Sequence, residues 1–306
     1  MGSETSTIQS LKAVDAWIDV INSNINGGVR TAFKSSRLKF GGSNVNIGRA
    51  GNATSLPLQI PETGLMTSNT VIDFSQGAIT ASTENTHLAV QGSGFFVVVD
   101  PTSAASASTG SVTLAAATSK VYLTRDGEFR TNQNGFLVNS SGYYLVSATI
   151  ATANPPTLTA ANMRLVYNNI DQTAVAGATG ANAVRLTDFV ANTFGSLAAT
   201  GAAYTSAPAA GTQAIVKVTL GAQSLQYSQF GSTVFDFSYP TGNTSISMSV
   251  GTTADATILN KSLEASNASM TQSVPELSLA QKLFSALTKV LQITQTNTDA
   301  VLNLIR

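Results

Sequence analysis

The side chains that perform most catalysis and metal binding are scarce in this sequence. The chain has one histidine, His87, and no cysteine in 306 residues. Without cysteine there is no disulfide, thiolate metal site or cysteine nucleophile. A single imidazole cannot form a histidine-based zinc site, and the scarcity of histidine disfavours a Ser-His-Asp catalytic triad. We therefore interpret His87, which lies between Thr86 and Leu88, as an ordinary hydrogen-bonded residue of a strand.

Two further patterns resemble functional motifs, but their surroundings do not fit. Gly92-Ser93-Gly94 precedes the strand-like run from Phe95 to Val99, whereas a phosphate-binding loop needs a helix amino terminus there. Asp126 and Glu128 flank a glycine of a turn, and two acids of one turn rarely enclose a glycosidic bond. The sequence predicts no catalytic residue, no cofactor and no metal site, and therefore a protein that is not an enzyme.

The composition narrows the class of protein further. Sixteen basic residues balance sixteen acidic ones, and only 10% of the residues are charged, against about 25% in an average soluble protein. A protein that mainly binds nucleic acid needs a surplus of Lys and Arg to neutralise phosphates, so this class is disfavoured. A weakly charged surface favours association with other molecules.

Targeting segments are not evident in the sequence. No apolar run approaches the ~18 residues of a membrane span. Residues 1–12 show no basic region followed by an apolar one, so we expect no cleaved signal peptide.

The elements that would organise the chain are helices at its two ends. In the first helix, apolar residues recur at steps of three and four, as on one face of a helix: Ile8, Leu11, Val14, Ile18, Ile21 and Ile25. Gly27-Gly28 then ends the pattern. Near the other terminus, Pro275-Glu276 is expected to open a helix with a similar stripe: Leu279, Leu283, Leu287, Val290, Ile293, Val301 and Leu304.

Each apolar stripe needs a partner, and two arrangements satisfy this need. The terminal helices can pair with each other as a coiled coil, or each can pack separately onto the central body. Three heptads form too short a run for the pattern alone to decide between them.

The middle of the chain has the pattern of a β domain. Residues 121–146 contain three turn signals, Asp126-Gly127, Asn134-Gly135 and Ser141-Gly142, separated by aromatic and aliphatic residues. This spacing predicts a β-meander. Further strands are expected at residues 71–74, 87–90, 95–99, 214–220, 233–239 and 245–250. Two stretches rich in Ala, Ser and Thr, residues 101–119 and 191–212, are expected to be exposed loops.

Charges are unevenly distributed along the chain. One stretch is basic, with Arg30, Lys34, Arg37, Lys39 and Arg49, and the next is acidic, with Glu62, Asp73, Glu84 and Asp100. The basic stretch is either a solvated loop or a face that meets the acidic one within the chain or on a neighbouring copy.

Four blocks of sequence resemble the axial proteins of the bacterial flagellum, the rod and hook proteins. The first runs from Ile21 to Phe40, the second from Phe74 to Phe96, the third from Tyr122 to Tyr143, and the fourth from Leu263 to Val290. Family-motif positions in these blocks are Asn24, Phe33, Lys34, Gln76, Gly77, Gly92, Gly94, Phe95, Phe96, Arg125, Gly127, Phe129, Gly135, Leu263, Glu264, Ser266, Asn267 and Gln281. The chain departs from the family at residues 28–32 and matches only weakly over residues 151–262.

The resemblance, together with the patterns above, implies a fold and a domain order. The fold class is α+β, mainly β, with central antiparallel β domains and terminal helices that pair as a coiled coil. Residues 1–40 and 263–306 are expected to form a helical inner-tube domain, and residues 41–150 a connector and β-hairpin domain. Residues 151–262 are expected to form a second β region, which either closes the body or stands as a separate outer subdomain.

The resemblance also implies a structural function. The chain is expected to polymerise with copies of itself into a helical tube, as a rod or hook component that is exported without a cleaved signal. Expected partners are adjoining rod, hook or junction proteins and the export machinery, with a location in the basal body or hook, across the periplasm or at the cell surface. Alternatives are a subunit of a non-motile surface filament and an adhesive or carbohydrate-binding β module. The predicted assembly residues are Leu11, Val14, Ile18, Ile21, Ile25, Leu283, Leu287, Val290 and Val301.

Overall fold

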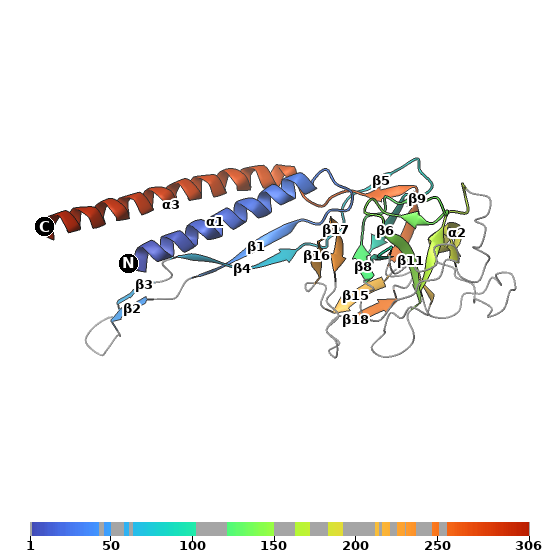
Figure 1. Ribbon diagram of the computed structural model, residues 1–306, viewed down its shortest axis with the longest axis horizontal. Helices are drawn as coiled ribbons and strands as arrows, with labels where there is room; N and C mark the ends of the chain where they lie inside the picture. Colours follow the sequence, from blue (N-terminus) through green and yellow to red (C-terminus); the bar gives the residue numbers. More distant parts are fainter. Residues whose placement is uncertain are drawn as a thin grey trace. The chain divides into compact units, whose positions relative to one another are not determined.

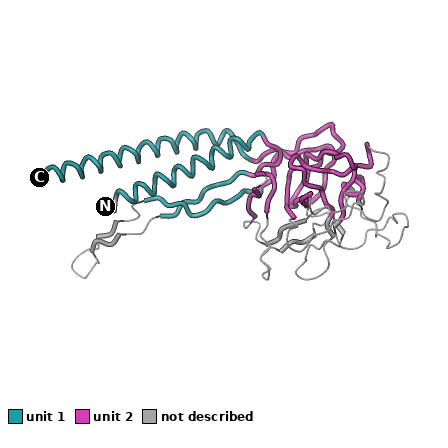
Figure 2. Tube along the Cα trace, in the orientation of Figure 1, with its two compact units in different colours: residues 1–29, 35–74, 268–306 teal, residues 30–34, 75–267 magenta. Residues whose placement is uncertain are grey.

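The structure is a computed structural model, and the chain in it divides into two compact units (Figure 2). Unit 1 contains residues 1–29, 35–74 and 268–306, and unit 2 contains residues 30–34 and 75–267. The structure describes residues 2–42, 46–49, 58–60, 64–101, 121–149, 163–171, 183–191, 212–213, 216–220, 225–229, 231–236, 247–250 and 256–305. Most of the two stretches predicted as exposed loops lies outside these residues.

Unit 1 consists of two long helices and a β-ribbon. α1 (Gly2–Gly27) and α3 (Met270–Ile305) pack on each other and run antiparallel (Figure 1). The ribbon pairs β1 (Ser36–Gly42) with β4 (Leu65–Ile72), and β2 (Asn46–Arg49) pairs with β3 (Leu58–Ile60). The ribbon therefore belongs to the helical unit, although the predicted helical domain included the chain only to residue 40.

Small residues on α1 allow the ribbon to approach the helix. Ser10 is buried, and its Oγ accepts a hydrogen bond from Leu65 N (3.0 Å). A Cβ atom added at Gly64 would lie 3.0 Å from the carbonyl oxygen of Ser6. The backbone at the start of β4 is therefore held against the first half of α1.

The start of α3 differs from the prediction. The helix begins at Met270, and Pro275 lies inside it rather than at its opening. Ser269 supplies the first acceptor, because its carbonyl oxygen receives hydrogen bonds from Gln272 N (3.2 Å) and Ser273 N (3.0 Å). Pro275 has no backbone N–H, so one helical hydrogen bond is missing at an exposed position of the second turn. The helix continues beyond this position to Ile305.

Unit 2 is built around an antiparallel sheet that includes ten strands among the described residues, with one parallel pair. Its main path is β13 (Ala183–Arg185), β12 (Met163–Tyr167), β11 (Tyr144–Thr149), β7 (Phe96–Val99), β8 (Val121–Thr124), β17 (Gly231–Asp236) and β16 (Gln226–Ser228). β9 (Arg130–Thr131), β10 (Leu137–Val138) and β14 (Thr212–Gln213) join from the side. Strands from both sides of residue 150 thus share one sheet.

Three smaller strand pairs and a short helix complete unit 2. β5 (Ile79–Ala81) pairs with β20 (Ser262–Glu264), β6 (Leu88–Gly92) with β19 (Ala256–Asn260), and β15 (Val216–Leu220) with β18 (Ser247–Val250). The short helix is α2 (Leu186–Ala191). The main core cluster draws on strands and α2 alike: Leu88, Val90, Phe96, Val98, Tyr122, Phe129, Leu137, Tyr143, Leu145, Val166, Val184, Leu186, Phe189, Val234, Ala256 and Ile258.

The predicted meander is present in its second part and differs in its first. β9, β10 and β11 pair consecutively, but β8 pairs with β7 and β17 instead of β9. Gly127 explains the difference, because its carbonyl oxygen accepts a hydrogen bond from Leu88 N (3.0 Å). The turn after β8 is therefore packed against β6 and does not close a hairpin.

The other two turns are stabilised by asparagine side chains. Asn132 Oδ1 accepts hydrogen bonds from Asn134 N (3.0 Å) and Phe136 N (2.9 Å). Asn139 repeats this pattern with Ser141 N and Tyr143 N. The glycines that follow, Gly135 and Gly142, both adopt φ of 83°, where glycine is favoured. Each turn thus spans Asn-x-x-Gly rather than a two-residue loop.

These elements confirm the prediction of an α+β fold with a helix at each terminus and antiparallel β-sheets. A coiled-coil geometry of the paired helices stays a prediction. None of the helices in the described part of the chain is both long and apolar enough to cross a membrane.

Candidate functional site

The predicted assembly residues fall into two groups in unit 1. Val14 and Ile21 are buried and form a cluster with Ala280, against which Trp17, Ile18, Ile25, Leu277, Leu283 and Leu287 pack. We call this set the helix seam. Leu11 is half-buried and lies outside this cluster. Ala280, Leu277 and Trp17 were not among the predicted assembly residues.

The remaining predicted residues of α3 face outward. Val290 is 50% exposed and Val301 58% exposed, and two neighbours from the same sequence stripe, Leu279 and Ile293, are 58% and 61% exposed. We call Leu279, Val290, Ile293 and Val301 the outer stripe. The four residues span about 80° on an ideal helix. The apolar stripe predicted from the sequence therefore contains both residues that pack between the two helices and residues that are exposed on the surface.

Hydroxyl groups beside the outer stripe already have acceptors within α3. Thr294 Oγ1 donates to Val290 O (2.6 Å), and Thr298 Oγ1 donates to Thr294 O (2.8 Å). A hydroxyl that is already hydrogen-bonded costs less to bury than a free one. This side of α3 can be covered at a small desolvation cost.

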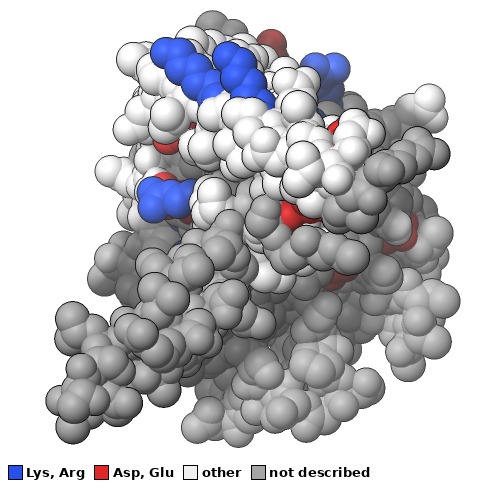
Figure 3. All heavy atoms as spheres, turned by 90° about the vertical axis from the view of Figure 1, so that its left-hand side faces the viewer, with Lys and Arg blue, Asp and Glu red and all other residues white. Residues whose placement is uncertain are grey.

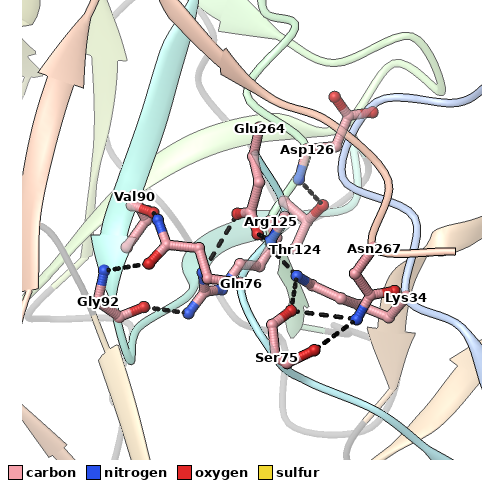
Figure 4. Close-up of polar contacts among 11 residues, drawn as sticks. Lys34, Ser75, Gln76, Val90, Gly92, Thr124, Arg125, Asp126, Glu264 and Asn267 are labelled. Carbon is pink, nitrogen blue, oxygen red and sulfur yellow. Dashed lines mark hydrogen bonds and ion pairs between the residues drawn. The ribbon is translucent and has the colours of Figure 1, made fainter. Parts of the chain in front are cut away.

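A second group of predicted residues meets in a buried ionic cluster of unit 2 (Figure 4). Lys34 Nζ donates to Glu264 Oε1 (2.7 Å), and Arg125 Nη1 donates to Glu264 Oε2 (3.2 Å). The side chains of Lys34 and Glu264 are fully buried, and that of Arg125 is 3% exposed. We call these three residues the Glu264 cluster. All three were predicted to be family-motif positions.

Backbone groups add further hydrogen bonds to the Glu264 cluster, whereas the buried Nε of Arg125 has no hydrogen-bond partner among the described residues. Lys34 Nζ also donates to Ser75 O (2.7 Å), and Arg125 donates through Nη2 to Gly92 O. Glu264 Oε1 accepts a further hydrogen bond from Gly77 N (2.8 Å). The carbonyl dipoles compensate for two cations that share one carboxylate, since buried charge is costly unless it is fully paired.

Motif positions around the cluster hold the segments that carry it. Gln76 bridges β6, because its Nε2 donates to Val90 O (3.2 Å) and its Oε1 accepts from Gly92 N (3.1 Å). Asn267 Nδ2 donates to Ser75 O (3.1 Å) (Figure 4). A Cβ at Gly77 would lie 2.0 Å from Ala265 O, so only glycine permits this approach.

The aromatic motif positions serve the core and flank the cluster. The guanidinium carbon of Arg125 lies 5.4 Å from the centre of the Phe95 ring, and Phe33 stacks on Tyr227 with ring centres 6.5 Å apart. Phe96 and Phe129 pack edge to face at 5.6 Å within the main core.

The other motif positions lie apart from the cluster or only line it. Asn24, in unit 1, joins α1 to β1 through Ser36, and Gln281 lies exposed on α3. Gly135 forms a turn, and Gly127 packs against Leu88. Gly94 is buried, while Leu263 and Ser266 are half-buried in and after β20.

Lys34 fits neither alternative for the basic stretch, a solvated loop or a face that meets the acidic stretch, because it is buried and pairs with Glu264. The sequence analysis placed Lys34 with Arg30, Arg37 and Lys39, but its side chain is buried, whereas the other three residues are exposed. The sequence held one clue to the cluster. Lys34, Arg125 and Glu264 were all predicted motif positions, and all three are charged in a chain with very few charges.

The single histidine of the chain behaves as expected, since His87 Nδ1 hydrogen-bonds Ser82 Oγ (2.7 Å).

Asp126, next to the cluster, is a buried acid with an unusual proton affinity. Burial raises its pKa to about 6, and the Glu128 carboxylate also acts to raise it. A hydrogen bond from Glu128 N, the charge of Arg30 and a hydrogen bond with Thr233 oppose this rise in pKa. In the described residues, no group of three or more His, Cys, Asp or Glu side chains could hold a metal ion.

The surface carries few charges, as the composition requires. On the face drawn in Figure 3, most described atoms belong to uncharged residues, with scattered Lys, Arg, Asp and Glu side chains. Such a surface is suited to contact with other protein surfaces.

Comparison with known proteins shows that part of the sequence is similar to flagellar proteins. Residues 89–169 match the family described as flagellar hook protein FlgE/F/G D1 domain. Flagellar hook proteins FlgE of Brucella abortus, Brucella suis and Brucella melitensis are each 42% identical over 73 residues, which is 24% of this chain and 14% of theirs. The crystal structure of Helicobacter pylori flagellar hook protein FlgE2 is 25% identical over 24% of this chain and 15% of that one, with a TM-score of 0.16. Residues 89–169 are thus similar to the D1 domain of flagellar hook proteins, and the matched segment spans about a seventh of the length of the Brucella relatives.

Proposed function

We propose that this chain is a structural subunit that assembles with copies of itself into a helical tubular filament, as a rod or hook component of the bacterial flagellum. The hook-protein match over residues 89–169 supports a place in the flagellar axis. The observation that carries assembly is the outer stripe of α3, an apolar surface that no other part of unit 1 covers among the described residues.

The outer stripe favours a protein partner over solvent. Leu279, Val290, Ile293 and Val301 are each half or more exposed. Burying apolar surface contributes about 25 cal/mol per Å². An isolated helix pair is only marginally stable in water, so packing among neighbouring helices would stabilise α1 and α3 further. The terminal helices would then be more mobile in the monomer than in the polymer.

A filament follows if the contact joins different surfaces of two copies. Contacts of this kind do not close on themselves and generate helical assemblies. The helix seam would hold each subunit's own helices together, and the outer stripe would contact the next subunit. The β-strands of unit 2 would set spacing through lateral contacts.

The family relationship supports the remaining parts of the proposal. Its partners would be copies of itself, adjoining rod, hook or junction proteins and the flagellar export machinery. Its location would be the basal body or hook, and its function structural rather than enzymatic. A non-motile surface filament built from the same subunit type is the alternative, whereas an adhesive β module is not favoured by the hook-protein match.

Assembly can be tested with substitutions confined to the outer stripe. The double substitution V290D and I293D should prevent polymerisation, because it places two charges in the proposed contact. The matched control is Q292D, which adds a charge at an exposed polar position of the same helix.

Sedimentation of the purified proteins at increasing concentration measures the outcome. We expect pelletable polymer from the wild type and from Q292D, and only monomer from V290D/I293D with unchanged circular dichroism. Normal polymer from V290D/I293D would contradict assembly through the outer stripe.

A further inference from the structure

The segments that follow α1 and precede α3 along the chain meet at the Glu264 cluster. Ala32 N donates to Glu264 O (2.8 Å), and Asn267 N donates to Phe33 O (3.2 Å). Lys34 and Glu264 add the side-chain ion pair. The two segments are therefore joined through both backbone and side chains.

A third segment depends on the same carboxylate. Gly77 N donates to Glu264 Oε1, and Ala265 N donates to Ala78 O (2.7 Å). β5 pairs with β20 so that Ile79 lies opposite Glu264. The Glu264 side chain thus accepts hydrogen bonds from Lys34, Gly77 and Arg125, which come from three different parts of unit 2.

We propose that the Glu264 cluster acts as a clasp that holds residues 30–34, 75–79 and 262–267 together. These three segments unfold locally and refold in a single cooperative step. Closure keeps the chain just after α1 within hydrogen-bond distance of the chain just before α3. Tethering two segments in this way raises the effective concentration of one for the other. The clasp would therefore bring α1 and α3 together before the helix seam forms, independently of whether the protein polymerises.

The charge arrangement makes the clasp asymmetric. Lys34 and Arg125 share one carboxylate, so losing Glu264 leaves two buried cations, whereas losing Lys34 leaves the Arg125–Glu264 pair intact. A buried charge without its partner is strongly destabilising, whereas a remaining pair is tolerated. A role in packing alone predicts no such order, because Glu→Gln changes shape less than Lys→Met.

Hydrogen exchange of the full-length monomer tests the clasp. In the wild type, amides in residues 30–34, 75–79 and 262–267 should share one opening free energy as denaturant is added, since segments that open together exchange together. Different opening free energies for the three segments would overturn the proposal, and this measurement needs no variant.

Two substitutions then test the charge order. E264Q should accelerate exchange in all three segments by at least about a hundredfold, with residues 96–99 and 144–146 still protected. K34M should accelerate hydrogen exchange in residues 75–79 and 262–267 by a clearly smaller factor than E264Q does. The control E128Q removes a carboxylate whose ion pair with Arg130 is exposed, and exchange should not change. Acceleration in one segment only, or a K34M effect as large as that of E264Q, would contradict the clasp.

Discussion

The charged residues of this protein have separate roles that their spacing along the chain does not reveal. Lys34, Arg125 and Glu264 lie in three distant sequence blocks and pair in the interior of unit 2. Half-buried Glu128 and exposed Arg130 form an ion pair that is expected to contribute little stability. The cost of burying the first set is offset by their ion pairs and by hydrogen bonds to the backbone.

Asp126 gives the protein a pH dependence with a definite sign. Its raised pKa means that the folded state binds this proton more tightly than the unfolded chain does. The free energy of unfolding should therefore fall as pH rises from about 4 to above 6. In D126N, the new amide oxygen still accepts from Glu128 N, but the side chain cannot ionise. The free energy of unfolding of D126N is compared with that of the wild type at each pH. The difference in favour of D126N should be about 2 kcal/mol larger at pH 7 than at pH 4.

Urea unfolding of the wild type and D126N at both pH values measures this difference. Glu128→Gln, in the same turn, serves as the control and should leave the pH dependence of the wild type largely in place. A gain for D126N that is equal at pH 4 and pH 7 would show that Asp126 does not titrate in this range.

Two glycines should respond very differently to alanine. A Cβ at Gly127 would lie 1.5 Å from Leu88 O, whereas a Cβ at Gly142 would meet nothing within 4 Å. G127A should cost about 3 kcal/mol or more, because backbone must move. G142A should cost only about 1–2 kcal/mol, from its φ of 83°. Thermal unfolding would measure both, and equal losses would contradict this packing.

At the scale of elements, the terminal helices have distinct inner and outer sides. The helix seam joins α1 to α3, and the outer stripe of α3 lies beside the seam and is exposed. Heptad spacing predicted both helices correctly, because 3.6-residue periodicity depends on local geometry. It could not separate Leu287, which packs on α1, from Val290, which is exposed, because both are aliphatic and lie in the same stripe.

Alanine substitutions should separate the two sides of the helices. I21A removes a fully buried side chain from the helix seam and should lower the stability of unit 1 by about 2–4 kcal/mol. V290A, at a position 50% exposed, should change it by less than about 0.5 kcal/mol. Circular dichroism at 222 nm during urea unfolding would measure both. Similar losses for the two variants would contradict the seam.

The β elements show where sequence patterns reach their limit. The strands at residues 96–99, 121–124 and 144–149 follow from their apolar runs and turn residues. Their partners do not, because β8 pairs with β7 and β17 through contacts distant in sequence. The Glu264 cluster was missed for the same reason, since its members converge only after the chain has folded.

At the scale of the whole molecule, the low charge content agrees with a subunit covered by copies of itself. Buried charge needs a partner and is expensive to desolvate. The exposed charges include Arg37 and Lys39 in the basic stretch and Asp73 and Glu84 in the acidic one. These groups can contact other copies from the surface, whereas buried Lys34 cannot.

Assembly should therefore depend moderately on salt. Screening weakens attraction between exposed opposite charges, whereas apolar contacts are affected much less. The critical concentration for polymerisation should rise severalfold between low and high sodium chloride. A charge-swapped control, D73K, should reduce this dependence, and complete insensitivity of the wild type would count against contacts between charged surfaces.

The most direct test of the account is cryo-electron microscopy of the protein polymerised at high concentration. The predicted result is a helical tube in which α1 and α3 form the inner layer. Leu279, Val290, Ile293 and Val301 would be buried against a neighbouring subunit. A protein that stays monomeric at every concentration would contradict the account, as would a polymer whose subunits touch only through β-strands while the outer stripe faces solvent.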